Sequence, residues 1–382
     1  MTTLSPETVA EPRSALPYFL SFGTIPIALL GAGLGGLWVL ALPVYCWCLF
    51  PALDAVLGLN LDDASLDTTD DQLRLYRLLT MAWFPLQFTM LCFMLWYVPQ
   101  AAHLTLAGKI GLFFGMGVMT GTIGLPYAHE LMHQSPRIER WLGDLLLASV
   151  LYSHFRTEHL RVHHLYVGTP RDAVTARYNE GFHRFYPRVL RDCPRSAWAA
   201  EKAMLARRNL PVWHWSNPFW RYGALQLAML ALALWLGGWA GLGLFLLQAG
   251  VAVWQLELAN YVEHYGLTRR HNGEGRYEHV MPRHSWNAAH RATNWLLINL
   301  QRHSDHHYKP DRRFPLLQNH PADEAPQLPF GYPVMTFAAM IPPLWRRVMN
   351  PRVRAWRKQF YPDIADWHSY NKALNPLPHG AP

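Results

Sequence analysis

The sequence predicts an all-α integral membrane protein in which six transmembrane helices carry a cytoplasmic helical cap with a histidine-rich di-metal site. Three observations predict this fold class. Long stretches of the 382-residue chain contain no charged residue. Histidines gather in four short motifs at or beyond the ends of such stretches. Arginine and lysine dominate residues 156–221 and 269–358, which contain two of these motifs.

Three uncharged regions each have the length of two membrane-spanning helices. Ser14–Leu53 and Tyr222–Leu256 contain no Asp, Glu, Lys or Arg, and Lys109 is the only charged residue between Leu78 and Ala128. Because about 20 apolar residues cross a bilayer as a helix, each region can form a helical hairpin. The expected turns are at residues 31–36, 99–100 and 237–238. The expected spans are residues 17–32, 36–53, 78–98, 104–128, 222–236 and 239–257.

The rest of the chain is expected to form catalytic regions at about residues 129–221 and 258–350, within one membrane-embedded domain, 1–382. A tail follows at 351–382, with disorder expected at its end, 375–382. The positive-inside rule places the basic segments in the cytoplasm. A soluble all-α protein with long buried helices is the alternative, and the length of the uncharged runs argues against it.

Cysteine content and charge exclude some classes of protein. The four cysteines form no C-x-x-C pair, which predicts neither a disulfide framework nor a fused iron–sulfur domain. The net charge of +8 is explained by basic loops of a membrane protein and by docking of an acidic partner, so no nucleic acid is expected.

The four motifs are HELMH at 129–133, EHLRVHH at 158–164, NYVEHYGL at 260–267 and LQRHSDHH at 300–307. Neutral imidazole is the commonest metal-binding side chain. Four-coordinate zinc would use at most four histidines, whereas two metals with four or five imidazoles each use all nine. The candidate ligands are His129, His133, His159, His163, His164, His264, His303, His306 and His307.

Histidines four residues apart lie on one face of an α-helix. His129 and His133 can therefore hold one ion together, and His159 and His163 repeat the same geometry. His164 points away from that second pair and can reach another ion. The histidines at 303, 306 and 307 form a tighter version of the same arrangement.

Three other functions remain open at this point. HELMH also matches the H-E-x-x-H motif of zinc proteases, with Glu130 as general base. Two E-x-x-H elements, at 130–133 and 180–183, match those of soluble carboxylate di-iron bundles. A metal transporter would place ionisable residues near the middle of the bilayer, but the uncharged runs contain only His103. The protease and the soluble bundle leave most of the nine histidines without a role.

The four motifs resemble the histidine boxes of the membrane-bound alkane 1-monooxygenases (alkane omega-hydroxylases), which are fatty-acid-desaturase-like membrane di-iron enzymes. NYVEHYGL and LQRHSDHH are the specific ones. The resemblance runs from about Leu16 to Asn350 and includes GRYEHVMPRHSWN at 275–287. PYAHELMH and VHHLYVGTP are more similar to xylene-type membrane monooxygenases, which would hydroxylate methyl-aromatics. Met132 and Gln134 replace the glycine and the basic residue of the family's first box.

The resemblance implies two non-haem iron ions held by the nine histidines, with O2 as co-substrate. It implies hydroxylation of a terminal methyl group to a primary alcohol, with electrons from rubredoxin, which an NADH-dependent rubredoxin reductase reduces. It also implies a multi-pass protein of the bacterial inner membrane, with its active site on the cytoplasmic side. The alkane would enter from the lipid phase.

Residues around the boxes are expected to support this chemistry. Carboxylates beside ligand histidines can accept the distal ring N–H and fix the tautomer; the candidates are Glu130, Glu158, Glu263 and Asp305. Asn260, Tyr261 and Arg302 are further candidates. Substrate-channel candidates are Trp38, Tyr45, Cys46, Trp47 and Trp83. A small side chain at Cys46, among bulky neighbours, would lengthen the channel.

Overall fold

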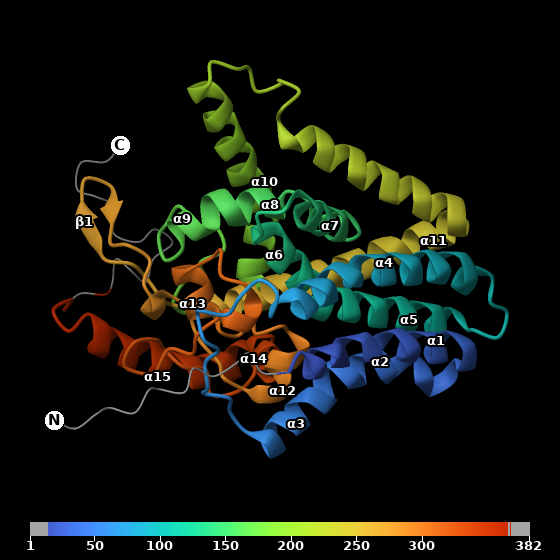
Figure 1. The fold of residues 1–382 in the computed structure, drawn as a ribbon, viewed down its shortest axis with the longest axis horizontal. Coiled ribbons are helices and arrows are strands. Elements are labelled where there is room, and N and C mark those ends of the chain that lie inside the picture. Colours follow the sequence, from blue (N-terminus) through green and yellow to red (C-terminus); the bar gives the residue numbers. More distant parts are fainter. Residues whose placement is uncertain (1–13, 366, 368–382) are drawn as a thin grey trace.

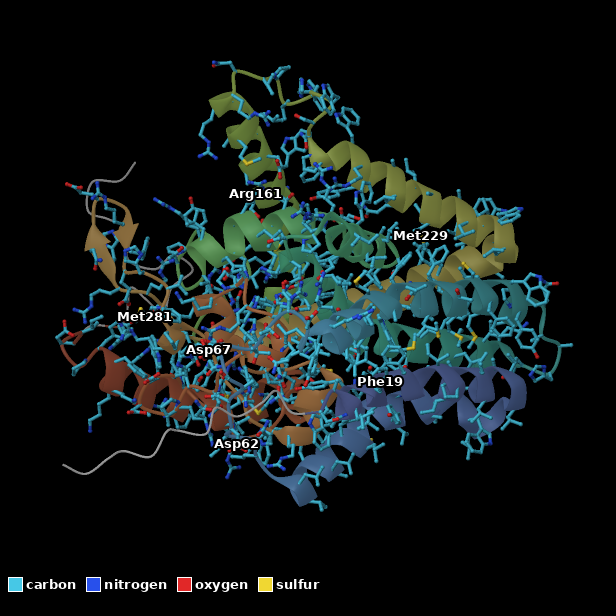
Figure 2. The ribbon with its side chains drawn as sticks, in the orientation of Figure 1. Phe19, Asp62, Asp67, Arg161, Met229 and Met281 are labelled. Atoms are coloured by element: carbon cyan, nitrogen blue, oxygen red, sulfur yellow. The ribbon has the colours of Figure 1, made fainter. Side chains whose placement is uncertain are left out.

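The computed structural model describes residues 14–365 and 367, and this part of the chain is mainly helical. Long helices extend toward one end of the molecule, and shorter elements form a cap at the other end (Figure 1). Nitrogen- and oxygen-bearing side chains crowd the cap, whereas the far ends of the long helices carry mostly carbon (Figure 2). This distribution is the one expected of a protein with an apolar, membrane-embedded half.

Five helical segments of the described chain are long and apolar enough to cross a membrane. They are Leu16–Leu34, Gly36–Leu57, Arg74–Gln100, Leu106–His133 and Pro218–His264. The sequence predicted six such helices. The difference lies in the last segment, a 47-residue helix that contains two of the predicted spans.

That helix, α11 (Pro218–His264), turns back on itself at Gly238, where φ is 60° and ψ is −157°. A Cβ atom on Gly241 would lie 3.0 Å from the carbonyl oxygen of Ala233, although these positions are about 12 Å apart in a straight helix. The two arms, residues 218–237 and 239–264, form the hairpin at the upper right of Figure 1. The turn is at the predicted glycine pair, since glycine adopts positive φ without strain.

The other long segments combine α-helices with 3-10 and π-helical turns. The first two contain α1 (Thr24–Leu34), α2 (Ala41–Val44) and α3 (Phe50–Leu57), with turns at Leu16–Gly23, Gly36–Leu40 and Tyr45–Leu49. The next two contain α4 (Arg74–Tyr97), α5 (Leu106–Met119) and α6 (Leu125–His133), with turns at Val98–Gln100 and Thr120–Gly124. The turns at Tyr45–Leu49 and Thr120–Gly124 are π-helical.

In the part of the chain that the structure describes, the cap is built from eight helices, most of them short, and one small hairpin. Its helices are α7 (Arg137–Ala148), α8 (Phe155–Glu158), α9 (His164–Tyr166), α10 (Phe182–Arg207), α12 (Arg291–Leu296), α13 (His303–Tyr308), α14 (Tyr332–Ala339) and α15 (Pro342–Phe360). A π-helix, His159–His163, joins α8 to α9, and 3-10 turns lie at Pro282–His284 and Phe314–Leu316. Strands β1 (His271–Gly273) and β2 (Arg276–Tyr277) pair antiparallel. Helix α15 continues across residue 350, and the predicted disorder at 375–382 lies outside the described residues.

Two buried carboxylates attach the cap to the long helices. Asp54, in α3, accepts hydrogen bonds from the backbone N–H groups of Ala292 (2.7 Å) and Thr293 (3.0 Å), which caps α12. Glu139, in α7, accepts from Arg77 at 2.9 Å and from Arg313 at 2.8 Å. Asp54 thus anchors α12, which precedes the histidine motif at 300–307, and Glu139 anchors Arg313, which follows that motif.

The glycines of α5 and its π-helical extension let three segments pack closely. A Cβ on Gly115 would lie 3.2 Å from Leu42 Cβ, which places this face against the second long segment. A Cβ on Gly117 would lie 2.6 Å from Val251 Cβ, in the second arm of α11. Small residues allow helix backbones to approach closely in membranes. Here Gly115 faces the second long segment and Gly117 faces the second arm of α11.

We expect Gly117→Ala to lower the stability of the protein by about 1–3 kcal/mol, because the added methyl group overpacks the contact with α11. Thermal unfolding in detergent measures the effect. Gly250→Ala is the matched control, since a Cβ there has no neighbouring atom within 4 Å. Equal midpoints for the two variants would contradict this packing.

Candidate metal centre

The nine candidate histidines come together as two adjacent groups. The first contains His129, His133, His159, His164 and His306, and the second contains His163, His264, His303 and His307. Within each group, one nitrogen of every ring lies within 4.8 Å of the corresponding nitrogens of the others. Four separate segments of the chain supply these rings, so the groups exist only in the folded protein.

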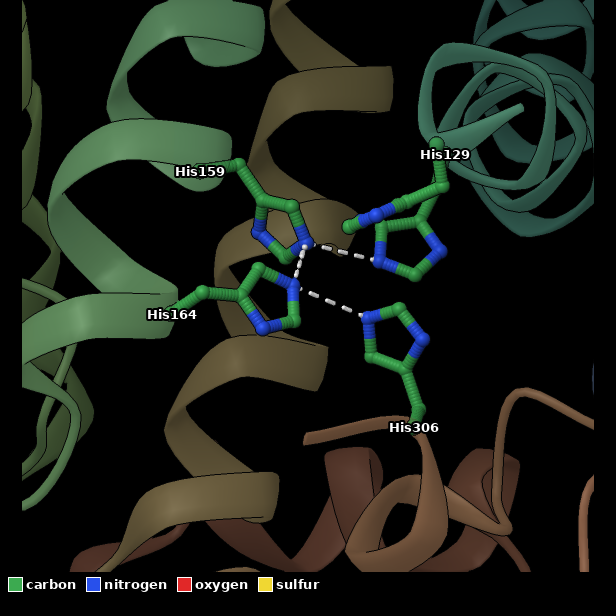
Figure 3. Close-up of side chains that lie close together, drawn as sticks. His129, His159, His164 and His306 are labelled. Atoms are coloured by element: carbon green, nitrogen blue, oxygen red, sulfur yellow. Dashed lines mark hydrogen bonds between the residues drawn. The ribbon is translucent and has the colours of Figure 1, made fainter. Parts of the chain in front are cut away.

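In the first group, the rings of His129, His159 and His306 converge from three different segments, with His164 beside His159 (Figure 3). The Nε2 atoms of His129 and His159 are 2.8 Å apart, and those of His159 and His164 are 2.9 Å apart. His306 Nε2 is 3.1 Å from His164 Nε2. His133 Nε2 is buried with no hydrogen-bond partner in the described chain.

The ring nitrogens of the second group are equally close together. His303 Nε2 is 3.1 Å from His264 Nε2 and 3.0 Å from His307 Nε2. His163 contributes Nε2, which is buried without a hydrogen-bond partner among the described residues. The other ring nitrogen of His163, Nδ1, is 3.0 Å from Oδ2 of Asp172.

The expectation that His159 and His163 hold one ion together is wrong, because they belong to different groups. The cause is the backbone: His159–His163 is a π-helix rather than an α-helix. A π-helix pairs position i with i+5, which brings position i+5 closer to the face of position i. His159 therefore shares its group with His164, and their ring centroids are 4.5 Å apart.

The motif LQRHSDHH at 300–307 divides in the same way. His303 and His307, four residues apart on α13, belong to the second group, whereas His306 belongs to the first. In both boxes the two neighbouring histidines, 163–164 and 306–307, thus contribute one ring to each group.

The chemistry of these groups fits metal ions. Burial and the neighbouring rings lower the pKa of His159, His164, His303, His306 and His307 well below its usual value. The rings are therefore neutral at pH 7, which is the form that binds metal. Two nitrogens bound at about 2.1 Å to one ion, at right angles, lie about 3 Å apart, as the observed separations do.

Two carboxylates contact histidines of the second group. Glu263 Oε2 is 3.3 Å from His303 Nε2. Asp172 contacts His163, as described above, and Thr175 Oγ1 donates to the same carboxylate oxygen at 2.6 Å. Burial alone would raise the pKa of Asp172, but His163 and Thr175 hold it below its usual value. Asp172 is thus an anion positioned to orient His163.

The other predicted carboxylates lie in different surroundings. Glu130 accepts a hydrogen bond from Gln134 at 3.0 Å. Asp305 is held by Arg312 at 2.6 Å and by His320 at 3.1 Å, so it stabilises the segment after α13. Glu158 is fully buried beside the Cys193 thiol.

The three further candidates also have contacts of their own. Arg302 donates to the carbonyl oxygens of Asn60 and Asp62, which attaches the loop after α3 to the cap. Tyr261 donates to the carbonyl oxygen of Glu180. Asn260 donates to Glu257 at 3.1 Å.

Asp172 was missed in the sequence because it lies outside the four boxes. The available signal was its place in a turn, nine residues after His163. Its other oxygen accepts from the backbone N–H of Val174 at 3.0 Å, and asparagine and aspartate favour such turns. A buried Asx turn directly after a histidine box is therefore a place to look for an orienting carboxylate.

A mainly apolar cavity of about 530 Å³ adjoins the two groups. His129, His159 and His303 form part of its wall, together with Asn260 and Glu263. Most of the remaining wall comes from the Tyr45–Leu49 and Thr120–Gly124 turns, from the second arm of α11 and from α14, with further residues from α6, α8 and the segment between α12 and α13.

Of the five channel candidates, Trp47 lies in the wall of this cavity. Cys46 is fully buried in the protein, and the wall residue beside Trp47 is Cys48. Trp83 donates to Gln87 inside the helix bundle, and Tyr45 donates to the carbonyl oxygen of Leu20. Trp38 is exposed on the apolar half.

Comparisons with known proteins agree with the geometry. Residues 104–339 match the fatty acid desaturase family. The chain is 41% identical to alkane 1-monooxygenase 2 of Pseudomonas aeruginosa over 312 residues, which cover 81% of this chain and 82% of the relative. It is 46% identical to alkane 1-monooxygenase 2 of Alcanivorax borkumensis, over 66% of this chain and 65% of the relative. The xylene/toluene monooxygenase hydroxylase component of Pseudomonas putida is 30% identical, over 65% of this chain and 66% of that protein.

We expect Asp172→Asn to weaken metal binding by about 10–100-fold, because the ring of His163 loses the anion that orients it. Competition with a chelator, followed by metal analysis, measures the change. Glu201→Gln is the matched control: Glu201 is also buried and hydrogen-bonded, to Thr157 at 2.9 Å, but it contacts neither histidine group in the described chain. The role of Asp172 is refuted if both variants retain metal equally.

Proposed function

The chain belongs to the fatty acid desaturase family and, within it, to the alkane 1-monooxygenases, and from this premise we propose that it hydroxylates the terminal methyl group of alkanes to primary alcohols. The co-substrate is O2, and the site holds two non-haem irons. The observation that carries the proposal is the position of two buried imidazole groups at the wall of an apolar cavity.

The nine histidines are the proposed iron ligands, five for one ion and four for the other. Imidazole suits iron among several metals, so iron is supported by the family together with the ligand set. Bound iron would supply the oxygen activation that an unactivated C–H bond requires. The protein's part is to hold the rings neutral and to orient His163 through Asp172. Glu263 lies 3.3 Å from Nε2 of His303, the nitrogen that faces its group, and so stands beside the proposed ion.

The cavity suits an alkane because its wall is mostly apolar, and the polar side chains of Thr122 and Gln255 in that wall are hydrogen-bonded to each other. A chain held there has no hydrogen-bonding groups, so shape and the exclusion of water position it. Val334 and Phe337 in α14 and Cys48 in the Tyr45–Leu49 turn belong to the cavity wall and also have exposed surface, so the cavity reaches the outside where the cap meets the apolar half. We place the entrance for alkane from the lipid phase between α14 and Cys48, to one side of the Trp47 indole.

Six membrane crossings are supported by the hairpin shape of α11, since each arm has the roughly 20 residues that a crossing requires. The basic segments at 156–221 and 269–358 then lie on the cytoplasmic side. The proposed location is the inner membrane of a bacterium, with the metal centre facing the cytoplasm.

The proposed electron donor is rubredoxin, reduced by an NADH-dependent reductase. The net charge of +8 supports docking of an acidic carrier on the cap. Hydroxylation of methyl-aromatics is the second candidate, because the xylene/toluene relative is 30% identical to this chain. A single-zinc protease would use few of the nine histidines that the two groups contain, and its candidate base, Glu130, is hydrogen-bonded to Gln134.

Purified protein in detergent is expected to contain about two irons per chain and to convert octane to 1-octanol when NADH, rubredoxin and its reductase are supplied. Metal analysis and gas chromatography measure both quantities. A parallel panel with xylenes and longer alkanes separates the two candidate substrate classes. Stoichiometric zinc with no oxygen uptake would contradict the proposal and favour the protease.

Replacing neighbouring histidines separates the two metal sites. His307→Ala leaves three rings in the second group and His306→Ala leaves four in the first, so we expect His307→Ala to lose the larger share of its ion. Iron analysis and Mössbauer spectra measure which site remains. His183→Ala should leave the iron content unchanged, because His183 lies outside both groups and contacts the carbonyl oxygen of Met340. Identical spectra for His306→Ala and His307→Ala would disprove the division into two groups.

A further inference from the structure

One polar side chain, Gln255, joins three segments at the wall of the cavity. Its Oε1 atom accepts hydrogen bonds from Trp47 Nε1 at 3.1 Å and from Thr122 Oγ1 at 2.9 Å. Its Nε2 atom donates to the carbonyl oxygens of Gly117 at 3.1 Å and Val118 at 3.2 Å. A primary amide has two acceptor sites and two donor hydrogens, and all four are used.

The neighbouring backbone is shaped to receive this amide. The two carbonyl groups directly precede the π-helix Thr120–Gly124, where the backbone pairing changes from i+4 to i+5. The carbonyl oxygen of Gly117 also accepts the backbone N–H of Thr120, so the Gln255 amide adds a further donor at this change of pairing. A Cβ on Gly121 would lie 2.5 Å from Gln255 Nε2, so glycine at this position lets the amide approach.

Gln255 lies on the side of the cavity away from the histidines. It precedes His264 by nine residues on the same helix arm, which corresponds to roughly 13 Å. Thr122 precedes His129 by seven residues, which corresponds to roughly 10 Å. Trp47, Thr122 and Gln255 all belong to the wall of the cavity, as do His129 and His303. The hydrogen-bonded trio therefore closes the end opposite the metal centre.

We propose that Gln255 is a specificity-determining residue that holds the Trp47 indole in place as the end wall of the substrate cavity. The inference rests on the proposed alkane hydroxylation. An indole N–H in apolar surroundings requires an acceptor, and Gln255 provides it on the inner side. Without that acceptor, the half-buried ring of Trp47 turns toward the lipid side and the cavity lengthens, so longer alkanes fit.

Turnover of an alkane series by the full-length protein tests this proposal. Gln255→Leu keeps the side-chain volume and removes every hydrogen bond of the amide. We expect the ratio of kcat/KM for hexadecane to that for octane to rise roughly tenfold. Gln248→Leu is the matched control, because Gln248 is buried on the same helix arm, donates to the carbonyl oxygen of Ser149 at 2.8 Å and lies outside the cavity wall. It should leave the ratio unchanged even if overall activity falls.

A second variant removes the same hydrogen bond from the other side. Trp47→Phe lacks the N–H group, so it should shift the ratio in the same direction, and the double variant should shift it no further than the larger single change. Trp47→Phe also tests the proposal by itself if Gln255→Leu does not fold. An unchanged ratio in a folded Gln255→Leu or Trp47→Phe protein, or an equal shift in Gln248→Leu, would overturn the proposal.

Retention of radiolabelled alkanes by the detergent-purified protein separates this inference from the proposed function. Wild-type protein is expected to retain octane better than hexadecane, and Gln255→Leu to retain both. If this difference is found but no variant produces alcohol, the hydroxylase function fails and the end wall stands. If wild-type protein produces 1-octanol but the retention is the same in both proteins, the end wall fails and the function stands.

Discussion

The division of neighbouring histidines between two groups is the constraint on which the cap depends. His163 and His164 serve different groups, and so do His306 and His307. Consecutive side chains share one backbone, so neither segment can shift without moving a ring of each group. The π-helix and α13 must therefore both lie beside the two groups, while α6 and the end of α11 supply the remaining rings. Moving the 159–164 segment or α13 would disturb both groups, whereas α6 supplies rings to the first group alone and α11 to the second alone.

The buried imidazoles stay in place only if hydrogen bonds from the surrounding chain fix the backbone that carries them. The turn that enters α13 shows how this is achieved. Ile298 and Asn299 both have positive φ, 44° and 58°, which costs of order 1–3 kcal/mol for each such residue. Asn299 compensates by hydrogen bonds to the carbonyl oxygens of Asn294 and Phe314, at 2.8 and 3.0 Å. The adjacent contacts of Arg302 with the loop after α3 fix the same turn, so strain at the site is balanced by bonds outside it.

The sequence predicts the parts of this arrangement that depend on composition and on repeated motifs. Uncharged runs locate the long helices, glycine pairs locate the hairpin turn of α11, and the boxes contain all nine clustered histidines. It does not predict the π-helix at 159–163, since α- and π-helical backbones use the same residue types and differ only in the pairing that tertiary contacts select. Asp305 shows the same limit: it neighbours His306 in sequence, yet Arg312 and His320 occupy its oxygens.

Three π-helical turns connect the polar and apolar halves of the site. At 159–163 the turn brings His159 and His164 into one group. At 120–124 it follows the two carbonyl groups that Gln255 binds, and at 45–49 it carries Trp47, which Gln255 also binds. A regular α-helix in any of these places would rotate the following side chains off the site. The two histidine groups and the far wall of the cavity thus depend on the same kind of backbone distortion. The α-helical residues between these turns set the distance from the histidines to the far wall.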